Sequence, residues 1–381
     1  MVNIIYRHYQ KGDDEQLADL FNRAFQMNGF GFVRTPKNWK WRYFNSPGFE
    51  AEMIQIAEDV DVNKIVGMIC VNPVEAVKLN GITYLNGNIN DVSCHPDYIR
   101  QGIAKRLMEM SIDYMKKKGC DISLLLTGFN GFPRKRLYSK FDYKDFERYF
   151  GYVSFPNLYK LIRDLPATIF LFPVLFTFSF IPRLINKIRI KFNSYFKRFS
   201  YKIVYNTNHF KYMESVKKVF KILYSGYPSF DKRKIIWARI KVSSKRHKPT
   251  YITIKKNGKI VGGVILTHAN VYSFKYGLKI RMGITHELFL DKTQFNNEKE
   301  LNYGYLYLID KLLKAASRRF VGLLLMEVSS RNYILRKCLK AYNFVKFQVQ
   351  SIMMLKLKDE LNISKPEKNL FVPTYLSLGF P

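Results

Sequence analysis

The sequence predicts a mixed α/β protein of two tandem domains, each a mostly antiparallel central sheet flanked by helices. A chain of 381 residues is longer than a domain with a single hydrophobic core usually is, and its length suits two domains. Stretches with strand and helix periodicity alternate along the first half, which favours α/β over an all-α fold. Similar short sequences return in the same order in the second half, which favours a duplication.

Periodicity, capping residues and turn-forming residues predict the elements of the first half in order. Two-residue alternation indicates strands, apolar residues three or four apart indicate helices, and an aspartate before a helix or a glycine after it marks its ends. The predicted elements are a strand at Ile4–His8, a helix capped by Asp13 or Asp14, a short helix around Trp39–Tyr43, strands at 53–57 and 65–71, a long strand at Ile82–Cys94, a helix that ends at Gly119, a strand at 121–126 and a helix at 134–141.

Three pairs of similar segments indicate the duplication. KIVG occurs at Lys64–Gly67 and again at Lys259–Gly262, each time where a turn opens a strand. WKWRYF around Trp41 corresponds to IIWARI around Trp237, and LYSKFDY corresponds to CLKAYNF near the end of each half. The expected organisation is a first domain at 1–153, a hydrophobic and basic linker at 154–204, a second domain at 205–358 and a tail at 359–381.

The net charge of +33 is concentrated in the second half of the chain. Residues 1–150 hold 21 Lys and Arg against 18 Asp and Glu, whereas residues 183–256 hold 21 against two. This distribution favours an anionic partner, and solvated lysines without a partner are the alternative. Nucleic acid is disfavoured as that partner, because the sequence holds no RNP-like or zinc-finger motif.

The four cysteines occur singly, without CxxC spacing or a clustered histidine. This pattern argues against a disulfide framework and a structural zinc, so we expect no metal and a reducing compartment. The N-terminus shows no apolar signal segment, and the expected location is the cytoplasm.

An uncharged stretch, LPATIFLFPVLFTFSFIP at Leu165–Pro182, separates the two domains. It contains five phenylalanines, and Pro173 is expected to interrupt it. One interpretation is a buried interdomain helix. The other is an interfacial anchor on an anionic membrane surface through residues 165–200, because basic residues follow from Arg183 onward. The second interpretation predicts a peripheral membrane protein.

The segment VSCHPDYIRQGIAK at Val92–Lys105 combines the end of a strand, a glycine loop and the start of a helix. Backbone N–H groups at a helix N-terminus have no intrahelical partner, so they bind anions. Gly102 lets a phosphate approach, and the small Ala104 keeps the next turn open. Arg100 and Lys105 add positive charge. The residues alone therefore predict a phosphorylated cofactor.

This segment resembles the signature of the GNAT superfamily of N-acetyltransferases, Arg/Gln-x-x-Gly-x-Gly/Ala after a strand and a proline. Gly102 and Ala104 stand at the required positions, whereas Ile99 replaces the first residue of the signature. The resemblance covers residues 3–150 well and 205–358 weakly. It implies acetyl-CoA as co-substrate and transfer of the acetyl group to an amine-bearing acceptor.

The resemblance also assigns the residues that bind the cofactor. The backbone of Val92 and Cys94 would pair with the pantetheine arm, so the Cys94 thiol is not a nucleophile. The residues around the pyrophosphate would be Arg100, Gln101, Gly102, Ile103, Ala104 and Lys105. No Cys, His and Asp order suggests a covalent intermediate, and direct attack by the amine is expected.

Direct transfer needs an acid for the leaving thiolate and a base for the attacking ammonium. The resemblance assigns the acid to Tyr138 in RKRLYSKFDY. The commonest position of the family's glutamate falls on Asn88, which is no base, so the nearby carboxylate Asp91 is the predicted base. A water relay and the C-terminal carboxylate of Pro381 are the alternatives.

The second copy lacks the glycine loop, because KTQFNNEKEL stands between its strand and its helix, and Leu339 occupies the position of Tyr138. We expect a degenerate domain that shapes or docks the substrate. The tandem arrangement resembles the enhanced-intracellular-survival acetyltransferases without their third domain. A Fem-type aminoacyl transferase and a non-catalytic module that binds membrane or nucleic acid are the alternative functions.

Overall fold

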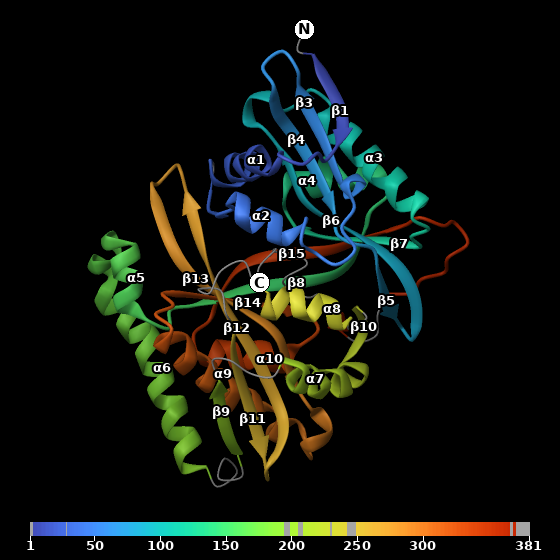
Figure 1. The fold of residues 1–381 in the computed structure, drawn as a ribbon. Helices are drawn as coiled ribbons and strands as arrows, with labels where there is room; N and C mark the ends of the chain where they lie inside the picture. The colour runs from blue at the N-terminus through green and yellow to red at the C-terminus, as the bar shows by residue number, and fades with distance from the viewer. Residues whose placement is uncertain are drawn as a thin grey trace.

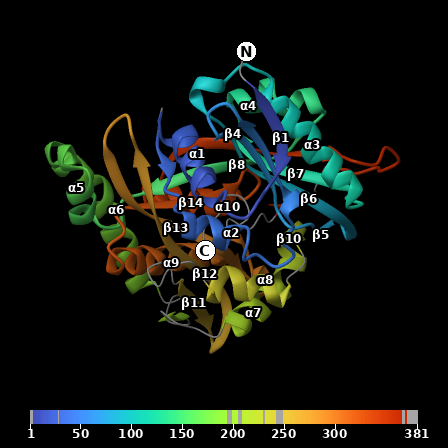
Figure 2. The same ribbon diagram turned by 45° about the horizontal axis from the view of Figure 1, so that its top comes forward.

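The computed structural model describes residues 3–27, 29–193, 199–204, 209–228, 231–241, 249–365 and 369–370. It forms two lobes with a helical connection packed on the outside of the second (Figures 1 and 2). The first lobe contains β1 (Ile4–His8), α1 (Asp14–Gln26), β2 (Gly31–Phe32), α2 (Pro36–Arg42), β3 (Ile54–Asp59), β4 (Lys64–Val71), β5 (Glu75–Leu79), β6 (Ile82–Cys94), α3 (Ile103–Lys117), β7 (Ile122–Gly128), α4 (Phe132–Arg136), the 3₁₀ turn η3 (Tyr138–Phe141) and β8 (Lys144–Ser154).

The connection contains α5 (Leu158–Asp164), the 3₁₀ turn η4 (Pro166–Leu171) and α6 (Phe172–Phe192). The second lobe contains β9 (Phe199–Val204), α7 (His209–Leu223), β10 (Tyr224–Pro228), α8 (Lys232–Ile235), the π-helical turn η6 (Ile236–Ile240), β11 (Thr250–Lys256), β12 (Lys259–Ser273), β13 (Leu278–Leu290), η8 (Lys292–Gln294), α9 (Glu298–Arg318), β14 (Leu323–Ser329), α10 (Tyr333–Ala341) and β15 (Val345–Lys356), and a short β16 (Asn369–Leu370) follows.

The elements predicted for the first half are present. β1 and β6 have the predicted bounds, and Gly119 follows α3 with φ of 71°. β5 was not predicted, because Pro73 separates it from β4 and its sequence EAVKL is mostly polar and alanine. The predicted helix at 134–141 is divided into α4 and η3.

One sheet passes through both lobes in the order β1-β3-β4-β6-β7-β15-β8-β14-β13-β12-β11-β9. The last strand of each half is exchanged. β15 lies between β7 and β8, and β8 pairs with β14, all antiparallel. β6 with β7 and β13 with β14 pair in parallel, so the sheet is mixed while the predicted fold class is correct. The sheet of each lobe is thus completed by a strand from the other half of the sequence.

Two short strand pairings between the lobes are equivalent to each other in the two halves of the chain. β2, which follows the first helix of its lobe, pairs with β12 at Val271 and Tyr272. β10, which follows α7, pairs with β5 at Val77–Leu79. Each lobe therefore gives the equivalent short strand to the other, and this supports the duplication.

Glycine of the repeated KIVG segment permits close packing in both lobes. A Cβ atom on Gly67 would lie 2.6 Å from Ile103 Cγ2 of α3, and one on Gly262 would lie 2.6 Å from Leu290 Cδ1. The core around Ile103 lies on one face of the first-lobe sheet, and a second core with Leu17 and Trp39 covers the other face. In the second lobe, α9 and α10 cover the main core.

Trp41 and Trp237, equivalent residues of the two halves, meet at the contact between the lobes. Their rings stack with centroids 5.0 Å apart and an interplanar angle of 19°. Trp41 Nε1 donates to the Trp237 carbonyl at 3.3 Å, and Trp237 Nε1 donates to the Trp41 carbonyl at 2.6 Å. Such reciprocal contact between equivalent residues is what a twofold axis between the halves produces.

Replacing Trp41 or Trp237 by alanine should destabilise the protein by about 3–5 kcal/mol, because each side chain is large and buried. The double variant should cost less than the sum of the single ones by about 1–3 kcal/mol, since each single change already removes the stack and one hydrogen bond. Urea unfolding of the four proteins measures this coupling. Additive losses would show that the two rings stabilise their lobes independently.

The apolar stretch of the connection is exposed in the structure. Pro166–Phe192 is long and apolar enough to cross a membrane, yet only 6% of its most apolar window is buried. The buried interdomain helix considered from the sequence is therefore wrong. Pro173 does not interrupt the stretch either, because it occupies the first turn of α6, where a backbone N–H is not needed.

Candidate active site

The strands β6 and β7 separate at the centre of the first-lobe sheet. Their parallel pairing covers only Asn86–Asn88 with Ile122–Leu124. Beyond this point β6 bulges at Asp91, whose φ is 47°, while β7 stays paired with β15 on its other edge from Ile122 to Gly128. Within the described structure, the edge of β6 at Val92 and Cys94 therefore has no partner strand on the β7 side. An extended ligand with amide groups fits such an edge.

The N-terminus of α3 lies at the end of this opening. Gly102 caps the helix in the left-handed conformation with φ of 81°, and no side chain caps it. A Cβ atom on Gly102 would meet no atom within 4 Å, so the space in front of the helix is open. The first turn holds no acidic residue. Its backbone N–H groups and the positive end of a 15-residue helix form a site for a phosphate group.

The predicted cofactor residues are brought together along this strand, loop and helix. Arg100 and Gln101 are exposed in the loop, and Arg100 has φ of 65°. Ile103 is buried beneath the helix start, Ala104 is partly exposed, and Lys105 is exposed near Glu109 at 3.8 Å. Ile103 thus contributes its backbone and anchors the helix, while the basic side chains remain at the surface.

Val92 and Cys94 are partly buried on the free edge of β6. Burial raises the pKa of the Cys94 thiol to about 11. The Cys94 Sγ donates to the Tyr98 carbonyl at 3.5 Å. The thiol therefore stays protonated near neutral pH, which agrees with a role for its backbone alone.

Tyr138 begins η3 and reaches into the core between the sheet and α3. Its side chain is 6% exposed, and its ring lies 6.1 Å from the ring of Tyr143. Burial raises the pKa of the Tyr138 hydroxyl well above its ordinary value. The hydroxyl is consequently protonated at neutral pH, as a proton donor must be.

Asp91 lies on the opposite side of β6 from α3 and is held by cationic partners. Arg42 Nε donates to its Oδ2 at 3.1 Å, the Tyr43 hydroxyl donates at 2.7 Å, and Arg34 Nη2 lies at 3.8 Å. Burial alone would raise the pKa of Asp91, but the two guanidinium groups outweigh it and hold the pKa below its ordinary value. These contacts fix the bulge, and they make the carboxylate a weak base.

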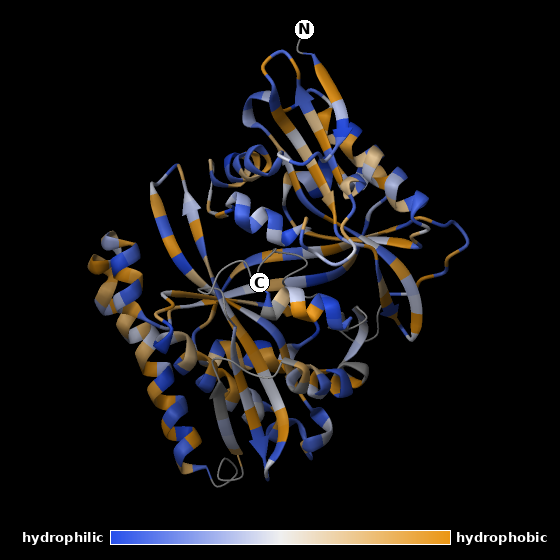
Figure 3. Ribbon diagram, viewed as in Figure 1, coloured by the Kyte–Doolittle hydropathy of each residue, from blue (hydrophilic) through white to orange (hydrophobic). Residues whose placement is uncertain are grey.

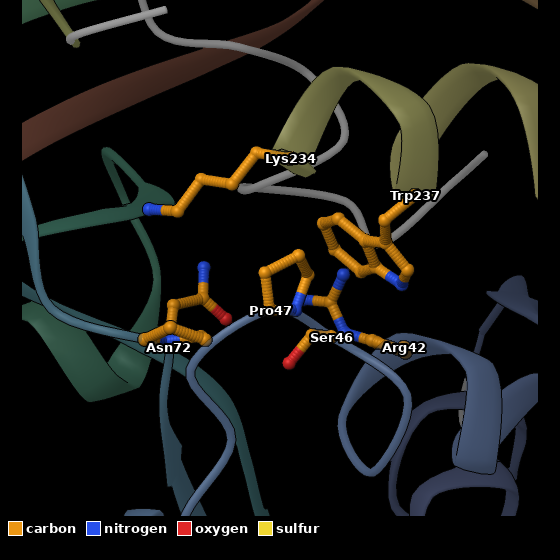
Figure 4. A pocket seen from close by; sticks show the side chains of 7 residues that line it. Arg42, Ser46, Pro47, Asn72, Lys234 and Trp237 are labelled. Carbon is orange, nitrogen blue, oxygen red and sulfur yellow. The ribbon is translucent and has the colours of Figure 1, made fainter. Parts of the chain in front are cut away.

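A pocket at the contact between the lobes lies next to this cluster (Figure 4). Its lining residues are Arg42, Ser46, Pro47, Asn72, Pro73, Lys234 and Trp237. The Asn72 N–H donates to the Asn88 carbonyl at 2.8 Å, so the pocket borders the strand position where the family's glutamate was expected. Asn88 is buried, and its Oδ1 accepts from Asn90 at 3.0 Å.

A polar cluster that was not predicted lies on β14 and on the exchanged strands β8 and β15. We name Glu147, Tyr149, Glu327, Ser329 and Gln350 the central polar cluster. Ser329 donates to Glu147, and Gln350 hydrogen-bonds to Glu327. Burial raises the pKa of Glu327 to about 7. The sequence signal was a single acid inside the apolar strand LLLMEVS.

Strand pairing connects this cluster to β7 of the first lobe through β15. Gln350 lies directly opposite Gly128 at the end of β7, and the Oε1 atom of Gln350 is buried without a partner among the described residues. β14 is the third strand from β7, across β15 and β8, and neighbouring strands are about 4.8 Å apart. The Glu327 side chain reaches back toward β7 through its hydrogen bond to Gln350 of β15. The C-terminal carboxylate of Pro381 lies outside the described residues.

The equivalent helix start in the second lobe is closed by acidic side chains. Asn297 caps α9, and Glu298 and Glu300 stand in its first turn. The Glu300 carboxylate accepts from the Asn296 N–H at 2.9 Å and lies 3.6 Å from Lys256. These carboxylates already occupy the positive end of the helix, so a phosphate would be repelled. Among the described residues, no group of three or more His, Cys, Asp or Glu could hold a metal ion.

Residues 5–145 match the family model of the acetyltransferase (GNAT) domain. The first lobe carries a GNAT domain. This match covers the open helix start, the separated strands and Tyr138, and it confirms the predicted acyltransferase class. No curated protein matches the chain.

Solved structures resemble this chain over nearly its whole length. N-myristoyltransferase from Saccharomyces cerevisiae, solved with bound myristoyl-CoA, is 13% identical with a TM-score of 0.67, covering 93% of this chain and 79% of that one. A GCN5-related N-acetyltransferase from Anabaena variabilis is 12% identical with a TM-score of 0.57, covering 93% and 73%. At these identities the likeness concerns the fold, and the two-lobed sheet is compatible with a tandem arrangement.

Proposed function

We propose that the protein transfers an acetyl group from acetyl-CoA to an amine by direct attack, with the first lobe binding the cofactor. The open N-terminus of α3 beside the free edge of β6 carries this proposal. CoA provides a pyrophosphate for the N-terminus of α3 and an amide-bearing arm for the edge of β6. The CoA site was predicted from the glycine loop, and the left-handed conformation of Gly102 supports that prediction.

Two side chains supply the proton transfers of this reaction. The amine nitrogen attacks the thioester carbonyl, the carbon–sulfur bond breaks, and the Tyr138 hydroxyl gives its proton to the departing thiolate. We propose Glu327 in place of Asp91 as the group that takes the ammonium proton. Asp91 is neutralised by Arg34 and Arg42, whereas burial raises the pKa of Glu327 to about 7, and its side chain hydrogen-bonds to Gln350 on β15, the strand that pairs with β7.

Replacing Glu327 by glutamine should lower kcat/KM about a hundredfold and remove the rise in rate as pH increases through about 7. The folded-state pKa lies above the unfolded value near 4.3, so the buried carboxylate lowers stability as pH rises between the two values. The Gln variant should therefore be at least as stable at pH 8, and unfolding does not explain lost activity. Rates of thiol release between pH 5.5 and 8.5 measure the profile.

Asp91→Asn is the matched control for the base. It should destabilise the protein, because two arginines lose a buried partner, but it should keep the rise near pH 7. A profile that loses this rise in Asp91→Asn and keeps it in Glu327→Gln would return the role of base to Asp91.

The acyl chain and the acceptor are tested together in one assay. Acetyl-CoA and myristoyl-CoA are each supplied with a peptide bearing a free N-terminal amine, a lysine peptide or a polyamine, and thiol release and mass gain are followed. We expect acetyl transfer, because the family model describes acetyltransferases. Transfer of myristate alone would keep the acyltransferase class and replace the acetyl donor with a long-chain one.

Aminoacyl transfer of the Fem type makes a different prediction. Such an enzyme takes its acyl group from tRNA, so CoA would bind weakly and no thiol would be released from acetyl-CoA. A non-catalytic module would bind CoA without turnover in any amine assay. The open phosphate site in the first lobe and its closed counterpart in the second favour the CoA-dependent enzyme.

A further inference from the structure

The helix α6 lies along the outside of the second lobe with one face exposed over its whole length (Figures 1 and 3). The exposed face is apolar. Its side chains, including those of η4, are between 40% and 87% exposed, and they are Ile169, Phe170, Leu171, Phe172, Val174, Phe176, Phe180, Ile181, Leu184, Ile185, Ile188 and Phe192. A soluble surface rarely presents so long an unbroken apolar row.

The face of α6 that contacts the protein carries polar residues along most of its length, with Ile190 packed against the main core near the end of the helix. Ser179 and Asn186 are buried, and Asn186 Nδ2 donates to the Ala341 carbonyl at 2.7 Å. The Arg183 guanidinium donates to the Phe155 carbonyl at 2.7 Å and to the Pro156 carbonyl at 3.0 Å. Arg183 and Asn186 thus hydrogen-bond toward the protein, while most of the apolar side chains of the helix lie on its outer side.

Aromatic rings form a continuous ridge on the apolar face. The rings of Phe172 and Phe176 are 5.7 Å apart, and those of Phe176 and Phe180 are 4.9 Å apart and stacked. Beyond the ridge, the exposed cations Lys187, Arg189 and Lys191 follow toward the end of the helix. The sequence holds no acidic residue between Asp164 and Glu214. This segment of the chain therefore combines an apolar row with positive charge and contains no acidic residue.

We propose that α6 and η4 dock the protein on an anionic lipid bilayer, with the helix lying in the interface. A hydrocarbon boundary accepts an apolar ridge of any side-chain shape, and anionic headgroups complement the adjacent cations. The helix does not cross the bilayer, because its polar face is bonded to the second lobe and to the segment after β8. Crossing would break these bonds and place Arg183 in hydrocarbon.

Flotation of the full chain with vesicles of phosphatidylcholine and 30% phosphatidylserine tests the proposal. Binding should weaken with salt and fall about a hundredfold when Lys187, Arg189 and Lys191 become glutamine, since each cation contributes about a factor of five. Changing Phe172, Phe176 and Phe180 to serine should abolish flotation. Their side chains are 40–47% exposed on the outer face, so the variant should keep its fold, which near-ultraviolet circular dichroism verifies.

The matched control changes three exposed apolar residues of the first lobe, Val62, Ile82 and Phe132, to serine. Their exposed fractions are 59%, 57% and 70%, and their loss should leave flotation unchanged. Equal flotation of wild type and the phenylalanine variant would overturn the proposal, as would no flotation of wild type at low salt. Retention on vesicles after an alkaline carbonate wash would overturn the interfacial arrangement in favour of a spanning helix.

Discussion

Gly102→Glu should weaken CoA binding about a thousandfold while leaving the protein folded. A carboxylate in front of α3 would lie near the pyrophosphate, and like charges about 4 Å apart cost roughly 4 kcal/mol at a protein surface. The same carboxylate would interact with the positive end of the helix and would therefore compete with the pyrophosphate for it. Because a Cβ atom there meets no atom within 4 Å, the packing of the lobe does not suffer. Calorimetric titration with CoA measures the change.

Two controls separate charge from backbone strain. Gly102→Ala keeps the unfavourable φ of 81° without the charge, and it should cost about 1 kcal/mol of stability with CoA binding reduced less than about tenfold. Gly258→Glu places the same residue at φ of 79° in the turn before β12 of the second lobe, and its CoA affinity should equal that of wild type. Unchanged affinity in Gly102→Glu would show that the phosphate site lies elsewhere.

The cofactor side of the site was predictable because its signals are local. A strand, a glycine loop and a helix start lie within residues 82–117, and each is encoded by its own neighbours. The structure places the bounds of β6 and the left-handed Gly102 where the pattern required them. The roles of these residues in binding remain predictions until CoA is titrated.

The proposed base Glu327 was not predictable, because its contacts are distant in sequence. Glu327 meets Gln350, whose strand β15 pairs with β7, only through the exchange of β8 and β15, and strand pairing across 200 residues leaves no local pattern. The duplication was visible in the sequence, but the exchange of strands was not. Asp91 illustrates the same limit, since the arginines that neutralise it come from before β3.

Composition identified the apolar segment between the lobes but not the direction in which its apolar side chains point. The row of phenylalanines and the following cations were evident, and they predicted either burial or a membrane contact. The direction of the apolar face depends on the hydrogen bonds of Arg183 and Asn186, which only the folded chain shows. If the membrane proposal holds, the acceptor amine is presented near a bilayer, and the phenylalanine variant should retain activity on a soluble acceptor.

Tyr138→Phe should lower kcat about a thousandfold and leave the Kd for CoA within about twofold. The substitution keeps the ring in its buried position beside Tyr143 and removes only the hydroxyl. General acids contribute about a hundredfold to ten-thousandfold in rate, and the thiolate left without a donor would depart slowly. Since the hydroxyl is used in the transition state, kcat and kcat/KM should fall together.

Tyr143→Phe is the matched control, because Tyr143 lies in the same core and loses the same atom. Its hydroxyl donates to Ser123 Oγ at 2.7 Å, so the variant should lose about 1 kcal/mol of stability while kcat stays within about threefold of wild type. Initial rates of thiol release at saturating acetyl-CoA, with the best acceptor of the amine panel, give kcat for all three proteins. A loss of less than about threefold in Tyr138→Phe would assign Tyr138 to packing, and the proton for the thiolate would then come from water entering the opening between β6 and β7.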